Sequence, residues 1–468
     1  MTVSHSISDI PRNLGGKALF APQRQFRLPI PVLLYLIALV TPVTFSIGSL
    51  QMTGIRLFLL VLIIPLVINL LRGKYNGIYW TDILFFLHLG WIGVALSKNS
   101  PEMLVTQIGS LGIEFLGGYL IGRAYIRNKE DFAGLLRMFI LLVCFSFPFA
   151  FFETLTGKPL IIQAIQQIPG LNSYYNADLD KRMGLERVQV FFLHPIHYGM
   201  FVSISFSLIF VGLNGTISNT RRYIYTLIIG LCVIFSLSSG ALLSLILQSI
   251  LILWATVFYR VKLRWLLLLL TCTFLYLLVD ILSNRSPIRV FMHYATFSAH
   301  NAYWRGIIFE WGMKNVWANP IFGLGLNDWV RPHYMYSGSM DNFWLVNAVR
   351  YGIPGFILLA SGYVIALWKI GRRNFDEDQT LWQLRRAWLI GFVGLTFTLC
   401  TVHVWANVYS FVFFVFGSGM WFLAAECSDG SATPENNIGA QSVELRTPQI
   451  LGQKDIPYSR FSSKRGRN

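Results

Sequence analysis

A polar stretch at residues 283–342 holds the side chains whose chemistry stands out in this sequence. It carries Arg285, Arg289 and Arg305, and it ends with Asp341 and an asparagine. The planar guanidinium of arginine suits phosphate and carboxylate groups. A carboxylate can accept a proton, or it can cap the helix that follows it. Together the arginines predict a site that binds an anion, with Asp341 beside it.

A second polar stretch, residues 154–194, adds further cations and a histidine. Its basic residues are Lys158, Lys181, Arg182 and Arg187, and it ends at His194. Long loops are translocated whatever their charge, so each of these residues can also be an ordinary solvated side chain. His194 and His197 are three residues apart, but no carboxylate or cysteine has the spacing to complete a metal site. The stretch therefore adds anion-binding candidates, and no metal is expected.

The composition indicates which elements must position these two stretches. Of the 468 residues, 54% are hydrophobic and 13% are charged, and the mean hydropathy is +0.54. A membrane-spanning helix needs about 20 largely apolar residues, and about twelve such segments are present. They lie at 29–47, 54–71, 78–96, 104–122, 132–153, 195–213, 222–237, 240–258, 265–282, 343–369, 387–404 and 407–425. The sequence therefore predicts an all-α polytopic integral membrane protein with two large outer loops.

Lysine and arginine in the short loops give the orientation. With the N-terminus in the cytoplasm, the five internal loops hold fifteen of them, and the four short outer loops hold one, Lys98. Both termini are therefore expected in the cytoplasm, and the two long loops in the periplasm. Because the basic residues are spread over many loops, no nucleic-acid partner is expected.

The expected organisation follows directly from this topology. It comprises a cytoplasmic N-terminal segment 1–28, spans one to five at 29–153, a periplasmic loop 154–194, spans six to nine at 195–282, a larger periplasmic loop 283–342, spans ten to twelve at 343–425 and a cytoplasmic tail 426–468. The tail is polar and basic at its end, which predicts disorder and contact with anionic membrane lipid.

The larger loop also contains a predicted helix, in the run NAYWRGIIFEWGMKNVWANP. Tyr303, Ile307, Trp311 and Lys314 fall at helical spacing and indicate an amphipathic face, and Pro320 closes the helix. Tryptophan and tyrosine favour the membrane–water boundary. This helix is expected to lie there and to hold an arginine over an opening to the lipid.

Three motifs in this order resemble those of the O-antigen polymerase and ligase superfamily, which includes exopolysaccharide polymerases. They are RVQVFFLHPIHYGMF (Arg187–Phe201), WRGIIFEWGMKNVWANPIFGLGLNDW (Trp304–Trp329) and DNFWLVNAVRYGIPG (Asp341–Gly355). The likeness covers roughly residues 180–425. It implies glycosyl transfer at the periplasmic face of the bacterial inner membrane, with inversion at the anomeric carbon and without a metal, nucleotide sugar or other cofactor. The implied partners are an undecaprenyl-pyrophosphate-linked oligosaccharide, an acceptor glycan, chain-length regulators and export proteins.

With this chemistry in view, we form a hypothesis for the roles of individual residues. Arg305, Arg187 and Arg289 would clamp the pyrophosphate of the donor. Asp341 would orient or deprotonate the acceptor hydroxyl, and Asn342 would hold sugar hydroxyls. The remaining substrate-binding candidates are Arg285, His194 and Arg350.

Two positions depart from the family pattern. Many relatives, the ligases in particular, have histidine where this chain has Asp341, which favours an exopolysaccharide or O-antigen polymerase. Many also have arginine at the position of Ser239, so one phosphate contact must come from elsewhere, with Arg285 and Arg289 as the candidates. An O-antigen ligase that transfers polymer to lipid A-core stays open. A transporter or flippase is less favoured, because no repeat relates the halves and the polar residues concentrate in outer loops.

Overall fold

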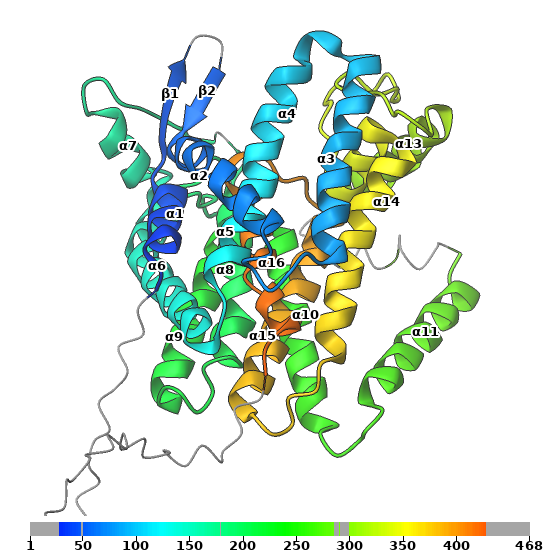
Figure 1. The fold of residues 1–468 in the computed structure, drawn as a ribbon. Helices are drawn as coiled ribbons and strands as arrows, with labels where there is room; N and C mark the ends of the chain where they lie inside the picture. Colours follow the sequence, from blue (N-terminus) through cyan, green and yellow to red (C-terminus); the bar gives the residue numbers. More distant parts are fainter. Residues whose placement is uncertain (1–27, 48–49, 178, 285–289, 291–298, 427–468) are drawn as a thin grey trace, which may run out of the picture. The chain divides into compact units, whose positions relative to one another are not determined.

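The structure, a computed structural model, describes residues 28–47, 50–177, 179–284, 290 and 299–426. Within these residues the regular secondary structure is helical apart from one small three-stranded sheet, and longer loops join some of the helices (Figure 1). The predictions for the N-terminal segment 1–27 and for the tail from 427 onwards fall outside the described residues. Arg285 and Arg289 fall outside them as well.

Eight helical segments of the described chain are long and apolar enough to cross a membrane. They are α2 (Gly54–Leu71), α3 (Trp80–Asn99), the composite helix Pro101–Tyr125, α6 (Lys129–Thr156), α10 (Ser239–Val257), α11 (Arg264–Leu282), α14 (Phe343–Arg372) and Ala406–Leu423, which begins with α16 (Ala406–Gly417). Shorter or less apolar helices occupy other expected spans: α1 (Ile30–Val40), α8 (Pro195–Phe210), α9 (Asn219–Phe235) and α15 (Gln379–Leu399). The chain is thus a polytopic integral membrane protein.

The first expected span, 29–47, is helical over a shorter length than predicted. α1 ends just before Pro42, which has no backbone N–H to continue a helix. Val43–Ile47 (β1) then pairs antiparallel with Leu50–Thr53 (β2) and with Asn172–Ser173 (β3). Alternating β-branched and aromatic residues favour a strand at this point. Reading the whole apolar run as one helix was therefore wrong.

The expected span 387–404 also ends early. α15 stops at Leu399, and residues 400–405 form a non-helical connection to α16. The connection carries His403 and Trp405, whose ring centroids lie 6.1 Å apart in a stacked arrangement. An apolar composition alone did not separate this connection from the helices on either side.

The expected span 104–122 is part of a composite helix. α4 (Leu104–Gly112) continues through a π-helical turn, Ile113–Gly117, into α5 (Gly118–Tyr125). The turn contains Glu114, whose Oε1 accepts a hydrogen bond from Nε of Arg56 at 2.7 Å. A π-turn inside an α-helix is frequently associated with a functional site. Arg56, at the start of α2, is therefore the partner of this carboxylate inside the membrane-spanning part of the chain.

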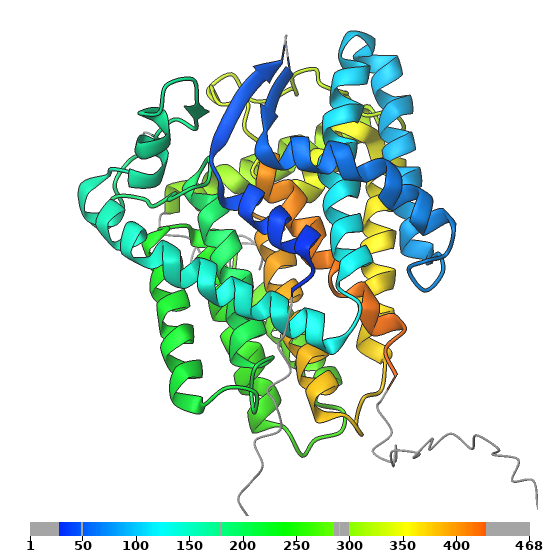
Figure 2. The ribbon, with the colours of Figure 1, turned by 60° about the vertical axis from the view of Figure 1, so that its left-hand side comes forward.

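Connections expected on opposite faces of the membrane lie at opposite ends of the helices. In both views β1, β2, the α3–α4 turn and the segment before α14 lie at one end, which is called the hairpin side below (Figure 1 and Figure 2). The α10–α11 and α14–α15 connections lie at the other end. The candidate site is built on the hairpin side.

Candidate functional site

Two segments more than a hundred residues apart bring basic side chains together. Arg182, Arg187 and His194 come from the loop before α8, and they interact electrostatically with one another. Arg305, on α13 (Ala299–Ala318), interacts in the same way with Arg182 and with Asp341. These five residues are called the arginine cluster below. The cluster contains three cations and one carboxylate, so it retains an excess of positive charge.

Burial lowers the pKa of two arginines in the arginine cluster. It lowers the pKa of Arg187 to about 10, with a further contribution from Arg182. Burial is also the main reason that the pKa of Arg305 falls below its ordinary value. Arg187 stays charged at neutral pH, but its buried Nε has no hydrogen-bond partner in the described part of the chain. A guanidinium with an unsatisfied buried donor is well suited to an anionic ligand.

His194 is uncharged in this environment. Burial, followed by the charges of Arg187 and Arg182, lowers its pKa to about 4. Its Nδ1 accepts a hydrogen bond from the backbone N–H of Ile196 at 3.1 Å and so caps the start of α8, with Pro195 in the first turn. In the neutral ring the proton is then on Nε2. His194 thus acts as a helix cap and a neutral hydrogen-bond donor, and the cluster keeps its charge on the arginines.

A carboxylate that the sequence did not single out shapes the loop that carries Arg187. Glu153, near the end of α6, accepts hydrogen bonds from the backbone N–H groups of Gln189 at 2.8 Å and Val190 at 3.0 Å. Glu153 is buried, and both bonds lie away from solvent. Because a carboxylate that accepts two backbone donors fixes a loop tightly, Glu153 positions the backbone that presents Arg187.

α13 confirms the helix predicted in the larger loop, and its packed face agrees with the predicted one in the middle only. Ile307 is buried against the first half of α14 together with Ile308 and Val316, and Trp311 packs partly against them. Tyr303, at one end of the predicted face, is 64% exposed. The packed face is therefore set by contact with α14.

The start of α14 corrects one alternative for Asp341. Asn342, and not Asp341, caps the helix, because its Oδ1 accepts a hydrogen bond from the N–H of Leu345 at 3.0 Å. Asp341 accepts a hydrogen bond from the hydroxyl of Ser339 at 2.8 Å and interacts electrostatically with Arg305. The capping role falls one residue later than expected, and Asp341 belongs to the arginine cluster.

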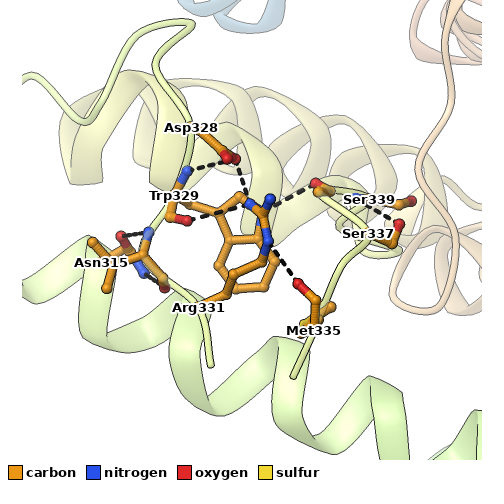
Figure 3. A network of polar contacts seen from close by, with 9 residues as sticks. Asn315, Asp328, Trp329, Arg331, Met335, Ser337 and Ser339 are labelled. Carbon is orange, nitrogen blue, oxygen red and sulfur yellow. Dashed lines mark hydrogen bonds and ion pairs between the residues drawn. The ribbon is translucent and has the colours of Figure 1, made fainter. Parts of the chain in front are cut away.

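The segment that leads to Asp341 is held by the network around Arg331 (Figure 3). Nη1 of Arg331 donates to Asp328 Oδ1 at 2.5 Å, and its Nε donates to the carbonyl of Met335 at 3.0 Å. Asn315 of α13 accepts from the N–H of Val330 at 2.9 Å and donates to its carbonyl at 2.8 Å. The hydrogen bonds of Asn315 therefore hold this segment against α13, the helix that carries Arg305. Arg331 itself has a structural role.

The glycine motifs join the end of α13 to α14. Gly323 has φ +64°, and a Cβ there would lie 2.5 Å from the backbone carbonyls of Val349 and Arg350. α14 itself is broken at Gly352, which has φ +73°. Backbone hydrogen bonds close the junction, from Leu324 N–H to the Val349 carbonyl at 2.8 Å among others. The Gly-x-Gly turn thus lets the backbone after α13 pack closely against α14, and it is not a nucleotide-binding loop.

A cavity of about 300 Å³ lies beside the arginine cluster. Its lining is Thr44, Thr53, Arg56, Gln107, Ser110, Leu111, Glu114, Tyr174, Leu193, Phe343, Val346, Asn347, Arg350, Tyr351, His403, Val404, Trp405, Ala406 and Tyr409. Arg350, a predicted substrate-binding residue, therefore faces this cavity. Burial is the main reason that the pKa of His403, in the α15–α16 connection, falls to about 4, and the charge of Arg350 adds to the effect.

The structure brings together four of the predicted site residues and places two others elsewhere. Arg187, His194, Arg305 and Asp341 are in the arginine cluster, whereas Arg350 lines the cavity and Asn342 caps α14. Sequence reasoning missed Glu153 and the pairing of Arg56 with Glu114. It named Arg182 only as one of several basic residues of its loop and gave it no role at the site.

The fold and the cluster define a class: a polytopic membrane protein with a cationic site on one side of its helices. The comparisons name a family. Residues 224–360 match the family model described as O-antigen ligase (Wzy_C), so this part of the chain is similar to that family. The matched region runs from α9 into α14 and contains Arg305 and Asp341. No curated protein matches the chain.

Proposed function

We propose that this protein is a glycosyltransferase that polymerises undecaprenyl-pyrophosphate-linked repeat units into exopolysaccharide or O-antigen at the periplasmic face of the bacterial inner membrane. The observation that supports it is the arginine cluster, in which Arg182, Arg187 and Arg305 accompany one carboxylate, Asp341. A diphosphate leaving group needs fixed cations, and a hydroxyl nucleophile needs a proton acceptor beside it.

The proposed reaction is a single displacement at the anomeric carbon of the donor sugar. The oxygen of the acceptor hydroxyl forms a bond to this carbon from the face opposite the pyrophosphate. The bond between the carbon and the phosphate oxygen breaks, and its electron pair leaves with the pyrophosphate. The hydroxyl proton passes to Asp341. The configuration is therefore inverted, and no metal takes part.

The arginines act on the leaving group. Negative charge grows on the bridging oxygen as the bond breaks, and preorganised guanidinium groups each contribute roughly 2–4 kcal/mol when water is excluded. Arg305 and Arg187 form the clamp. Arg182, whose Nη1 donates to the carbonyl of Leu237 at 2.6 Å, lies beside the start of α10 and replaces the arginine that relatives carry at the position of Ser239. Arg289 and Arg285 are further candidates outside the described residues.

The proposed topology has twelve spans, with both termini in the cytoplasm and the hairpin side in the periplasm. The eight long apolar segments, together with α1, α8, α9 and α15, supply twelve helices in the described chain. The clustering of lysine and arginine in the loops opposite the hairpin supports this orientation. The arginine cluster then lies where a lipid-linked donor would present its pyrophosphate.

The test uses a deletion strain complemented with wild type, Arg305→Ala, Asp341→Asn or Lys314→Ala. Lys314 is the matched control, because it is an exposed cation on the same helix and pairs with Glu310 at 3.1 Å. Membrane levels of each variant are measured by immunoblot, and lipid-linked glycan and polymer are analysed together.

A polymerase predicts single repeat units on the carrier and no polymer for Arg305→Ala and Asp341→Asn, with normal polymer for Lys314→Ala. Polymer that stays on the carrier and is missing from lipid A-core would show a ligase instead. Normal polysaccharide in both site variants would refute the site and favour a transporter.

A further inference from the structure

We infer that the cavity beside the arginine cluster binds the terminal sugar of the acceptor glycan, an inference that rests on the proposed function. The volume of about 300 Å³ is at the lower end of the range of ligand pockets, roughly 300–1,000 Å³. Such a size suits a small polar ligand and excludes a long stretch of polysaccharide. Its residues are also distinct from the cluster proposed to hold the donor.

The side chains that line the cavity are suited to bind a polyhydroxylated ligand. Arg56 and Glu114 form an ion pair whose side chains are 23% and 4% exposed, so hydroxyl groups can bond to both without separating them. Polar side chains of Gln107, Ser110 and Asn347 add donors and acceptors. Aromatic residues supply flat apolar surface on the remaining walls, among them Trp405. Few but convergent polar groups within an aromatic wall are typical of small-molecule sites.

The same lining argues against the two other parts of the donor. A prenyl chain would place hydrocarbon against the Arg56–Glu114 ion pair and against the polar side chains of the lining, and it could not replace their hydrogen bonds to water, which is costly. A pyrophosphate would meet the carboxylate of Glu114, which already pairs with Arg56, so Arg350 is the cation of the lining that this carboxylate leaves over. The arginine cluster has three cations to one carboxylate and therefore suits such an anion better. A neutral sugar is therefore the ligand that fits the cavity.

The cavity adjoins the arginine cluster along two edges. Leu193 lines the cavity and directly precedes His194, and the ring centroids of His194 and Trp405 lie 6.0 Å apart. On the other edge, Phe343 lines the cavity two residues after Asp341. The cavity is therefore lined by residues one and two positions along the chain from His194 and Asp341 of the arginine cluster. Transfer of a sugar from a donor held by the arginine cluster to an acceptor in the cavity requires the two sites to be adjacent.

The test fills the cavity and compares the two substrates. In Ser110→Leu the larger side chain enters the cavity, and in Gln107→Leu a polar group of the lining is lost at similar volume. Ser97→Leu is the matched control: Ser97 is an exposed helical serine whose hydroxyl donates to the carbonyl of Val94 at 2.8 Å, much as Ser110 donates to Thr106 at 2.9 Å. Purified full-length protein in lipid nanodiscs is assayed with lipid-linked repeat units as donor and an oligosaccharide released from the polymer as acceptor.

Ser110→Leu is expected to raise the KM for the oligosaccharide about tenfold or more, with the KM for the lipid-linked donor unchanged. Gln107→Leu should act in the same direction, and Ser97→Leu should change neither. An unchanged acceptor KM in both cavity variants, or an effect on the donor alone, would overturn the inference.

A binding measurement without donor separates this inference from the proposed function. Calorimetric titration of the same oligosaccharide into wild type and Ser110→Leu needs no turnover. Binding that Ser110→Leu weakens supports the cavity even if wild type makes no polymer, an outcome in which only the proposed reaction fails. Equal binding by the two proteins refutes the cavity even if polymerisation is observed.

Discussion

The junction between α13 and α14 can be tested by adding one methyl group at Gly323. The φ of +64° is in the left-handed region, and the added Cβ would lie 2.5 Å from the carbonyl carbon and oxygen of Arg350. Those are backbone atoms and cannot rotate away as a flexible side chain can. Gly323→Ala must therefore either strain the turn or move it away from α14.

The expected cost has two parts. An L-residue in the left-handed region costs about 1–2 kcal/mol, and a methyl group forced into a packed contact costs about 1–3 kcal/mol. The sum is about 2–5 kcal/mol. Gly73 tests the cost of the left-handed conformation alone, since it has φ +72° and a Cβ there would have no atom within 4 Å. Gly73→Ala is therefore expected to cost about 1–2 kcal/mol alone.

The assay compares thermal unfolding in detergent and glycan transfer for the two variants and wild type. Gly323→Ala should be less stable than Gly73→Ala, because only Gly323 meets backbone atoms. It should also lose transfer activity, because a shifted turn moves the first half of α14 relative to Arg305. Equal stability of the two variants, or full activity of a destabilised Gly323→Ala, would refute the close-packed junction as the element that holds the site.

Two further predictions concern caps at the site. Asn342→Ala should lower the free energy of unfolding by about 1 kcal/mol through loss of the α14 cap, whereas Asp341→Asn should leave it unchanged; denaturant titration in detergent measures both, and equal losses would contradict the assignment of the cap. Burial lowers the pKa of His194 to about 4 in the folded protein, so between pH 4 and the ordinary value of about 6.5 the unfolded chain binds more protons and stability falls as the pH falls. His194→Asn, which can still cap α8, should show a smaller decrease in unfolding temperature from pH 7.5 to pH 5, and an unchanged decrease would count against this role.

Much of the architecture followed from hydropathy, because long apolar runs and the asymmetry of basic loops are local properties of the chain. The places where the prediction failed are those where local composition is ambiguous. Val43–Ile47 is as apolar as a helix but pairs with strands elsewhere. The connection 400–405 is apolar but not helical. In both cases tertiary contact overrides the hydropathy signal.

The candidate site was predictable to the extent that its residues lie in motifs. Arg187, Arg305 and Asp341 are in separate motifs, and the fold brings them together. Arg182 could be named as a basic loop residue but not singled out, because its position depends on a contact with the carbonyl of Leu237, between α9 and α10. The role of Glu153 depends in the same way on backbone groups far along the chain. Such long-range contacts leave no periodicity in the sequence.

The break in α14 at Gly352 has a consequence for how the protein enters the membrane. The break lies inside a candidate membrane span, where backbone groups without partners are costly. Here the carbonyls of Val349 and Arg350 accept hydrogen bonds from Leu324 and Gly325. Because residues 323–325 are synthesised before α14, the chain carries the partners of the broken helix ahead of the helix itself. The backbone groups freed by the break thus have their partners in a turn that precedes α14 in the chain.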